Sequence, residues 1–364
     1  MTSRPYVETV VFLGGISADV RMWVNRHPDE NHPEVLATEG SFGPGGRAAS
    51  AAVGAVRLGR RFVDLVGCVG DDMLGNVIVQ SLKSEGVSVR LVDRMDSVQT
   101  GLRQVTLDGN GRRHSVEAPN ANWHVGESQA RRAESTILGA DLLFATLEVP
   151  IDTVRRVVKT ASARKLPVLL NAVPVSTATD IPLLSPTATG RSAAPAPAKA
   201  GGFASGAMVD EELLSLVDVL LLSWQGAQEL AGSADDAGAM GVQLARRLLD
   251  KGAKAVVITL GEHGSLVATG GRHALVEPYA VRSIDLTGAG DAYAAALAVG
   301  LTDESRGQYR WEHLLRAARF ASAAAAVSTT RLGGQSSLPT RDDVERLLTT
   351  QPTPAEMPGH VSTF

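Results

Sequence analysis

Residues 285–293 read Asp-Leu-Thr-Gly-Ala-Gly-Asp-Ala-Tyr (DLTGAGDAY), and this stretch decides the fold. The segment that follows Asp291, AYAAALAVGL, carries no charge and predicts a helix buried around most of its circumference. Gly288 and Gly290 lack side chains, so an anion can approach the free N–H groups where that helix begins. Asp291 places a carboxylate in the same turn. Backbone donors for a migrating phosphoryl group, beside a base for the attacking hydroxyl, are the two requirements of phosphoryl transfer.

The same nine residues have a simpler interpretation. Thr287 or Asp291 could cap the helix while the two glycines only make a turn, which is the commoner meaning of a short glycine-rich stretch. The stretch alone does not separate these interpretations, so the rest of the chain has to decide.

Composition excludes several classes of protein. The chain has 364 residues, of which 44% are hydrophobic, and a formal net charge of -4, which suits one large α/β core or two modest ones. The slightly negative net charge does not predict a basic surface for binding nucleic acid. The single cysteine, Cys68, rules out a disulfide framework or cysteine metal cluster within one chain and is expected in the core. No apolar segment reaches membrane-spanning length, and we expect a cytoplasmic protein with no membrane partner.

Apolar strand-like runs alternate with helical patterns along most of the chain. This rhythm predicts an α/β fold with three layers, a mostly parallel sheet carrying helices on both faces, in one domain over residues 1–349. The expected strands lie within 7–15, 61–70, 140–148, 166–174, 217–224 and 253–261, and the expected helices within 47–59, 72–87, 153–165 and 240–252.

Four segments break this rhythm. Residues 19–40 are polar and extended, and residues 97–115 alternate about a DGNG turn, so we expect the two to form a small β lid. Residues 182–208 are rich in Pro, Ala, Gly and Ser and predict a mobile surface insertion, because they cannot bury enough apolar surface to offset ordering entropy. Residues 350–364 predict a flexible tail.

The order of motifs resembles the ribokinase-like (PfkB) carbohydrate kinases over about residues 10–348. The matching segments are FLGGISAD, FGPGGRAASAAVGAVRLG, VGCVGDDMLG, TGLRQVTLDGNGRR, TLEVP, LLNAVP, VITLGEHGS, DLTGAGDAY and TRLGGQSSLP. A single glycine-rich match would be weak, but this many at coherent spacing is specific. Among the branches of the family, the sequences TLEVP and LLNAVP most resemble those of the ribokinase branch.

The resemblance implies an ATP-dependent sugar kinase that uses Mg²⁺ and could use K⁺. Asp291 would be the catalytic base that acts on a primary hydroxyl of the sugar, ribose or a related pentose being favoured. The N–H groups of Gly288, Ala289 and Gly290 would form the anion hole for the transferred γ-phosphoryl group. Sugar hydroxyls would be held by Asp19, Gly45, Gly46, Ser50 and Glu148.

The resemblance also implies nucleotide and cation sites. The nucleotide would contact Ser223, Thr259, Gly261, Gly264 and Ser322. Asp285, with backbone carbonyls near Ser328, Arg331 and Gly333, matches the position of the family's monovalent cation site. Lids in this family often pair between subunits, which makes a homodimer through the lid an expectation.

Four positions depart from the family pattern. Ser50 and Ser322 stand where asparagines are usual, and Ser223 with Gly226 replaces the Asn-x-x-Glu segment that organises magnesium. Two alternatives therefore stay open. One is a catalytically weak relative that binds sugar or nucleotide and regulates. The other is a different acceptor on the same fold, either a keto-sugar acid or a nucleoside, whose base Val20, Met22 and Trp23 of the lid could cover.

Overall fold

The computed structural model describes residues 8–109, 113–172, 209–232, 240–304 and 310–351. The expected insertion at 182–208 and all but the first two residues of the expected tail lie outside these ranges.

The main sheet has nine strands within the described residues, in the order β13-β12-β11-β10-β9-β8-β1-β4-β5. Neighbouring strands from β11 to β5 run parallel, while β12 and β13 run antiparallel to the strand before each. Their bounds are β1 Thr9–Leu13, β4 Phe62–Gly70, β5 Ser88–Met95, β8 Leu142–Thr146, β9 Val168–Asn171, β10 Val219–Ser223, β11 Ala255–Thr259, β12 Ser265–Thr269 and β13 Arg272–Val276. The expected mostly parallel sheet is confirmed.

The expected strands form the middle of this sheet. Of the three strands that sequence analysis missed, β5 and β13 are the edge strands, and β12 lies between β13 and β11. Central parallel strands are covered on both faces and read as continuous apolar runs. An edge strand is only partly covered, so its sequence is mixed. β5 carries Arg90, Asp93 and Arg94, and β13 begins Arg272-His273, which hides both strands from a search for apolar runs.

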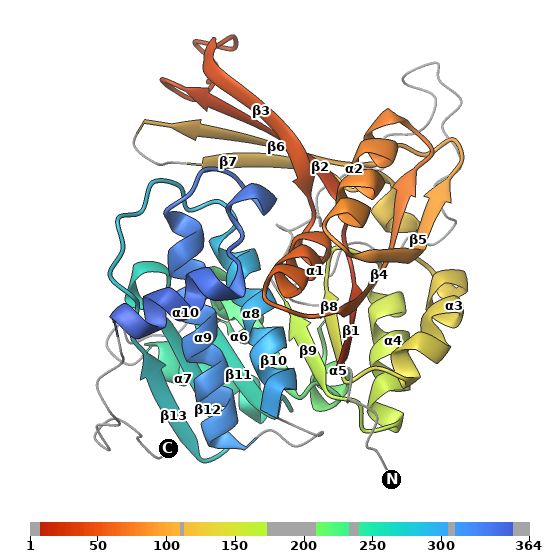
Figure 1. Cartoon of the computed structure of the whole chain (residues 1–364), viewed down its shortest axis with the longest axis vertical. Helices are drawn as coiled ribbons and strands as arrows, with labels where there is room; N and C mark the ends of the chain where they lie inside the picture. Colours follow the sequence, from red (N-terminus) through yellow and green to blue (C-terminus); the bar gives the residue numbers. More distant parts are fainter. Residues whose placement is uncertain (1–7, 110–112, 173–208, 233–239, 305–309, 352–364) are drawn as a thin grey trace.

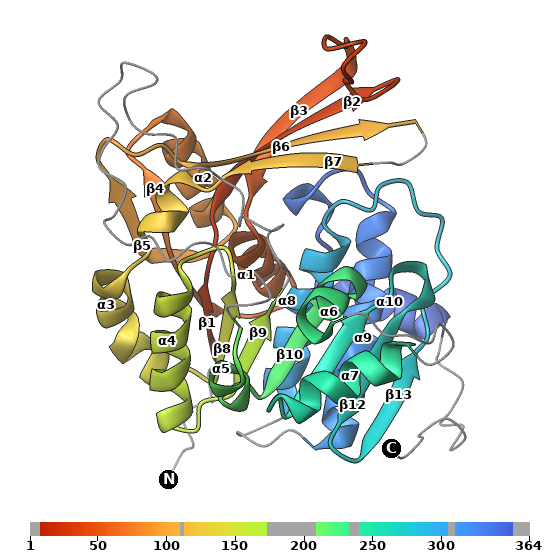
Figure 2. The ribbon, with the colours of Figure 1, turned by 180° about the vertical axis from the view of Figure 1, so that it is seen from behind.

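Helices cover both faces of the sheet, and Figures 1 and 2 show these two helical layers from opposite sides. One layer holds α1 Arg47–Arg57, α2 Met73–Ser84, α8 Ala289–Glu304, α9 Trp311–Thr329 and α10 Arg341–Thr350. The other holds α3 Glu127–Leu138, α4 Ile151–Ala163, α5 Glu211–Ser215, α6 Trp224–Ala231 and α7 Met240–Asp250. Successive side chains of β1 point to opposite layers, Phe12 to the first and Leu13 to the second.

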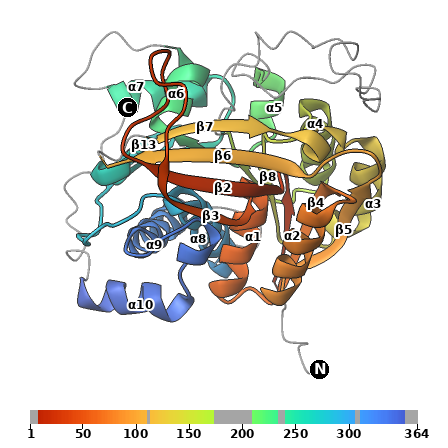
Figure 3. The same cartoon turned by 90° about the horizontal axis from the view of Figure 1, so that it is seen from above.

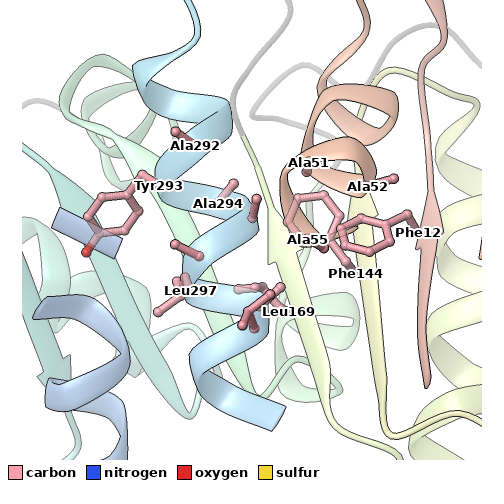
Figure 4. Close-up of a cluster of buried hydrophobic side chains, with 14 of the residues drawn as sticks. Phe12, Ala51, Ala52, Ala55, Phe144, Leu169, Ala292, Tyr293, Ala294 and Leu297 are labelled. Carbon is pink, nitrogen blue, oxygen red and sulfur yellow. The ribbon is translucent and has the colours of Figure 1, made fainter. Parts of the chain in front are cut away.

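The layer around α8 is built mainly from small side chains. Figure 4 shows α8 beside α1, and the rings of Phe12 and Phe144 of the sheet pack at a tilt of 42° with 5.0 Å between their centroids. A methyl group added at Gly300 of α8 would lie 2.9 Å from Cα and Cβ of Ala317 in α9. The apolar sequence AYAAALAVGL thus lets neighbouring helices approach α8 closely and fixes where its first turn lies.

Two further expectations concern Cys68 and membrane-spanning helices. Cys68 is buried in β4, and burial raises the pKa of its thiol to about 12, as expected for an inert core residue. None of the helices in the described ranges combines the length and the apolar character required to cross a bilayer.

A separate four-stranded sheet, which we call the lid, lies across one end of the main sheet (Figures 1 and 3). It has the order β3-β2-β6-β7, and the bounds of its strands are β2 Ser17–Val24, β3 Ala37–Gly45, β6 Gly101–Asp108 and β7 Arg113–Ala118. The expected segments 19–40 and 97–115 supply most of it, and the observed strands extend further, to Gly45 and to Ala118. β2 and β6 pair in parallel over their whole length.

Replacing Gly300 tests the close packing of α8. We expect Gly300→Ala to lower the free energy of unfolding by about 1–3 kcal/mol, because overpacking outweighs the better helix propensity of alanine. Gly241→Ala in α7 is the matched control, since its added methyl would meet neighbours at an ordinary 3.5 Å. Urea unfolding of both variants measures the difference. A Gly300→Ala protein as stable as the wild type would show that α8 and α9 can move apart at no cost.

Candidate active site

The carboxyl ends of the central strands and the start of α8 enclose a cleft of about 190 Å³. Ligands in open α/β sheets bind outside the carboxyl ends of parallel strands, which is where this cleft lies. The lid lies over this edge of the sheet (Figure 2). The cleft is lined by Arg47, Arg103, Arg113, Asn171, Leu221, Leu222, Ser223, Thr259, Leu286, Thr287, Gly288, Gly290 and Asp291.

The glycine-rich turn before α8 has the geometry of an anion site. Gly288 has φ +90°, a conformation that glycine adopts readily, and a methyl group there would lie 2.8 Å from the Gly334 carbonyl oxygen. The Ala289 N–H donates to the Leu286 carbonyl at 3.3 Å. No described carbonyl accepts from Gly288 or Gly290, so these two N–H groups remain available to an anion.

Asp285 holds this turn in place. One of its carboxylate oxygens accepts from the Thr287 N–H and the other from the Gly333 N–H, both at 2.8 Å. The Ser337 hydroxyl donates to the Thr287 carbonyl at 3.2 Å. The turn is therefore fastened to the loop between α9 and α10 from two sides.

The Asp291 carboxylate faces the cleft and forms no hydrogen bond or ion pair with the described residues. Burial raises its pKa to about 7, while Arg103 and Arg47 oppose the rise. A carboxyl with a pKa near neutrality can accept a proton from a positioned hydroxyl. Asp291 therefore has the exposure to the cleft and the basicity that a general base needs.

Asp19, on β2, lies beside the same cleft. It is 2% exposed, accepts from the Ser17 hydroxyl at 3.1 Å and is paired with Arg103 of β6. A methyl group at Gly45 would collide with the Asp19 carboxylate, so only glycine fits there. Gly45 and Asp19 are brought together as expected, and Arg103 is the partner that sequence analysis did not foresee.

Glu148 holds the first turn of α1. Its carboxylate accepts from the Gly15 N–H at 3.2 Å and from the Arg47 N–H at 3.0 Å, and its side chain pairs with the Arg47 guanidinium at 3.3 Å. Gly46, the N-cap of α1, has φ +92°. Both residues lie at the cleft edge, and the bonds of Glu148 fix the chain there.

Of the remaining predicted residues, some line the cleft and others do not. Ser223 and Thr259 line the cleft at the ends of β10 and β11. Ser50 is buried and accepts from Gln335 at 3.3 Å. Outside the residues that line the cleft lie Gly261 and Gly264, at the turn after β11, Ser322, buried in α9, and Ala289. Their roles stay predictions.

The expected monovalent cation site coincides with the loop that Asp285 braces. Asp285 contacts Gly333 as described, and the Ser328 carbonyl accepts from the Arg331 N–H at 3.2 Å. The Arg331 side chain turns away to pair with Asp343 at 2.8 Å. Asp285 lies before α8, and Ser328, Arg331 and Gly333 lie at and just after the end of α9, in the segment that Asp285 contacts. That this region binds a cation stays a prediction.

Comparison with known proteins assigns the chain to a family. The model for pfkB family carbohydrate kinases matches residues 7–189 and 201–341. A ribokinase from Haemophilus influenzae is 30% identical over 94% of this chain and 98% of its own length. The chain belongs to the pfkB family of carbohydrate kinases.

Solved structures agree with this assignment. The crystal structure of ribokinase from Thermotoga maritima has a TM-score of 0.71 at 25% identity, covering 94% of this chain and all of that one. Arabidopsis thaliana ribokinase, solved in complex with ribose and ATP, has a TM-score of 0.72 at 24% identity, with 94% and 99% covered. The ribokinase-like fold is therefore confirmed, and the chain is an ATP-dependent carbohydrate kinase by family.

Sequence analysis missed several residues of the pfkB-family cleft, among them Arg47 of α1, the lid arginines Arg103 and Arg113, and Asn171. Asn171 is the last residue of β9 and is 4% exposed, and its buried amide oxygen has no hydrogen-bond partner. Its position after an apolar run, in LLNAVP, was the available signal. No comparable local signal marks the two lid arginines, because they reach the cleft only through the pairing of the lid strands.

The orphaned Asn171 oxygen also bears on magnesium. Mg²⁺ keeps several waters and is held by few protein oxygens together with substrate phosphates. The described residues contain no group of three or more His, Cys, Asp or Glu side chains that could cage a metal. A hydrated ion carried by ATP, with Asn171 accepting from one of its waters, fits this sparse set of donors.

The raised pKa of Asp291 has a consequence for stability. In the folded chain the pKa is about 7, above the ordinary 3.8, so this group stabilises the fold at low pH and that contribution is lost as pH rises toward 7. Asp291→Asn should therefore raise the melting temperature by about 2–5 °C at pH 8 and by less at pH 5. Scanning calorimetry at both pH values measures this. Asp152→Asn, at an exposed residue of α4, is the control; equal shifts at both pH values would contradict the pKa.

Proposed function

We propose that this chain is a cytoplasmic kinase that transfers the γ-phosphoryl group of ATP to a primary hydroxyl of a small sugar of pentose size. The observation that carries the proposal is the unpaired Asp291 carboxylate, which faces the cleft directly beside the free N–H groups of Gly288 and Gly290. Similarity to ribokinases favours ribose and related pentoses as the first acceptors to test.

The mechanism follows from the placement of these groups. The sugar lies under the lid, with Asp19 and the backbone at Gly45 and Gly46 holding its hydroxyl groups. ATP enters along the ends of β10 and β11, where Ser223 and Thr259 line the cleft. Asp291 orients the acceptor hydroxyl and takes its proton as the new P–O bond forms.

Charge on the transferred group is stabilised by the start of α8. The Gly288 and Gly290 N–H groups donate to its oxygens, and the helix dipole favours negative charge at that end. Magnesium bound to ATP neutralises phosphate charge. The lid shields the cleft from water, which suppresses transfer to water in place of the sugar.

A coupled ADP-release assay over ribose, other pentoses, hexoses, sugar acids and nucleosides tests this function. We expect turnover with at least one acceptor, and Asp291→Asn should lower its kcat by about 10²–10⁴-fold because the proton acceptor is lost. Asp152→Asn should match the wild type. Turnover that survives in Asp291→Asn would remove Asp291 from the reaction.

A catalytically weak regulatory relative remains the second candidate, favoured by Ser223 and Gly226 in place of the magnesium-organising pair. Such a protein would show a thermal shift with sugar or nucleotide and no product above the Asp291→Asn blank. A nucleoside acceptor has less support. Val20 and Met22 alternate with Asp19 along β2, so they lie on the face of the lid away from the cleft, and only Trp23 shares the cleft face.

We also propose a homodimer that pairs through the outer face of the lid. Neighbouring strands place Phe42, Val20 and Val116 on one row of this face, and Val116 is 71% exposed. Exposed apolar side chains gathered on one sheet face mark an interaction surface.

Light scattering coupled to size exclusion tests the dimer. We expect the mass of two chains for the wild type and a shift toward one chain for Val116→Asp, which places a charge in the apolar row. Leu275→Asp, at an exposed residue of β13, is the control. A Val116→Asp protein with the wild-type mass would place the interface elsewhere.

A further inference from the structure

The inner face of the lid, which looks toward the cleft, is unusually rich in arginine. Strand register puts alternate residues of β2, β6 and β7 on this face in three successive rows. The rows are Asp19, Arg103 and Glu117, then Arg21, Val105 and Ser115, then Trp23, Leu107 and Arg113. Each row thus carries one arginine.

Arg21 is the most unusual of these. It is 5% exposed, its buried Nε has no hydrogen-bond partner, and its guanidinium forms no hydrogen bond or ion pair with any described residue. Glycines surround it. A methyl group at Gly43 would lie 3.4 Å from Nη2, and one at Gly333 would lie 3.0 Å from Nη1. These glycines leave room for the Arg21 guanidinium, but no described carboxylate pairs with it.

An unpaired charge in such a position is costly. Burying a guanidinium without a partner sacrifices its hydration, and apolar side chains of similar size would avoid that cost. Val105, the neighbour of Arg21 on β6, shows that an apolar residue is accommodated on the same row. The position of Arg21 points to a ligand, because Gly334 beside it contacts the Gly288 turn.

Arg113 lies on the cleft wall and, unlike Arg21, its side chain is exposed. It lines the cleft and forms no hydrogen bond or ion pair with the described residues. Desolvation, then repulsion by Arg103 and Arg47, lowers the pKa of its guanidinium. Arg47 and Arg103, by contrast, have Glu148 and Asp19 as partners. Neither Arg21 nor Arg113 has a carboxylate at hydrogen-bond or ion-pair distance among the described residues, although Asp291 and Glu117 attract Arg113 at longer range.

We infer that the acceptor sugar carries an oxyanion group, a carboxylate or a phosphate monoester, which Arg21 and Arg113 bind from the inner face of the lid. This inference rests on the proposed function and names its substrate class. The guanidinium fork matches carboxylate and phosphate oxygens in bidentate geometry, and hydrogen bonds between charged groups are stronger than neutral ones. A neutral sugar offers these side chains only hydroxyl oxygens.

The γ-phosphate of ATP is the competing anion. Nucleotide phosphates approach from the ends of β10 and β11, where Ser223 and Thr259 lie, whereas Arg21 is surrounded by Gly43, Gly333 and Gly334. Arg21 is not itself among the residues that line the cleft, and we assign it to the acceptor side because it shares the inner face of the lid with Asp19 and Arg103. Kinetics separate the two roles, because an arginine that binds ATP changes the KM for ATP with every acceptor.

Matched acceptor pairs test the inference: D-ribose against D-ribonate for a carboxylate, and D-fructose against D-fructose 6-phosphate for a phosphate. Each acid keeps a free primary hydroxyl. We expect kcat/KM for at least one acid to exceed that of its neutral partner by at least about tenfold. Arg21→Met and Arg113→Gln should each reduce this preference by about 10–100-fold, with KM for ATP within about twofold. Arg26→Gln, at an exposed arginine just after β2, should match the wild type.

A second readout separates a binding role for Arg21 from a structural one. Without ligand, Arg21→Met should melt at a higher temperature than the wild type, because it removes a buried unpaired charge. An arginine that holds the lid together would give the opposite sign. Arg21→Lys, which keeps the charge without the fork, should recover part of the preference for the acid.

The outcomes separate this inference from the proposed function. Equal kcat/KM for acid and neutral partners, or arginine variants that change only the KM for ATP, would overturn the inference and leave the kinase function standing. If no acceptor is phosphorylated, the kinase proposal fails. Thermal shifts without ATP then decide the inference: larger shifts with D-ribonate or D-fructose 6-phosphate than with the neutral sugars, lost in Arg21→Met, support it, and their absence overturns it.

Discussion

The two hydrogen bonds of Asp285 are the constraint on which the site depends. They tie the turn before α8 to the loop after α9 through the Thr287 and Gly333 N–H groups, each at 2.8 Å. The turn needs this support because Gly288 takes a positive φ, and because Gly334 packs directly against it. Preorganised donors stabilise developing charge only when they do not have to reorganise during the reaction. A carboxylate that never touches the substrate can therefore govern how well the anion site performs.

The acidic residues around the cleft divide by their partners. Glu148 uses its oxygens on the Gly15 and Arg47 N–H groups, and Asp19 is paired with Arg103. Asp291 alone among the site carboxylates lacks such a partner within the described residues. Burial raises the pKa of the Asp291 carboxyl, and no hydrogen bond from a described residue offsets that rise. The fold thus satisfies the other site carboxylates and leaves Asp291 facing the cleft.

Sequence alone predicted the parts of the structure whose causes are local. The six central strands were found because burial on both faces makes each an apolar run, and the α8 turn was found because GAGD lies within four consecutive residues. The edge strands β5 and β13 escaped because partial exposure admits charges, and β12 is a buried strand of only five residues without a long apolar run. Arg21, Arg103 and Arg113 escaped for a different reason. Their common face exists only through the pairing of β2 with β6 and β7, and the spacing of residues along one strand does not reveal that register.

That register also explains how one small sheet can serve two purposes. Alternate residues place Val20 on the outer face and Asp19 and Arg21 on the inner face, so a slip by one residue would exchange the two sets. On the inner face, the charge of the acceptor would affect how well Asp19 can bind its hydroxyl groups. Arg103 pairs with Asp19 and so occupies a carboxylate expected to hold sugar hydroxyls. An acceptor with its own oxyanion can draw arginine fork contacts to itself and leave Asp19 free for hydroxyls, whereas a neutral sugar must compete with Arg103 for the same oxygens.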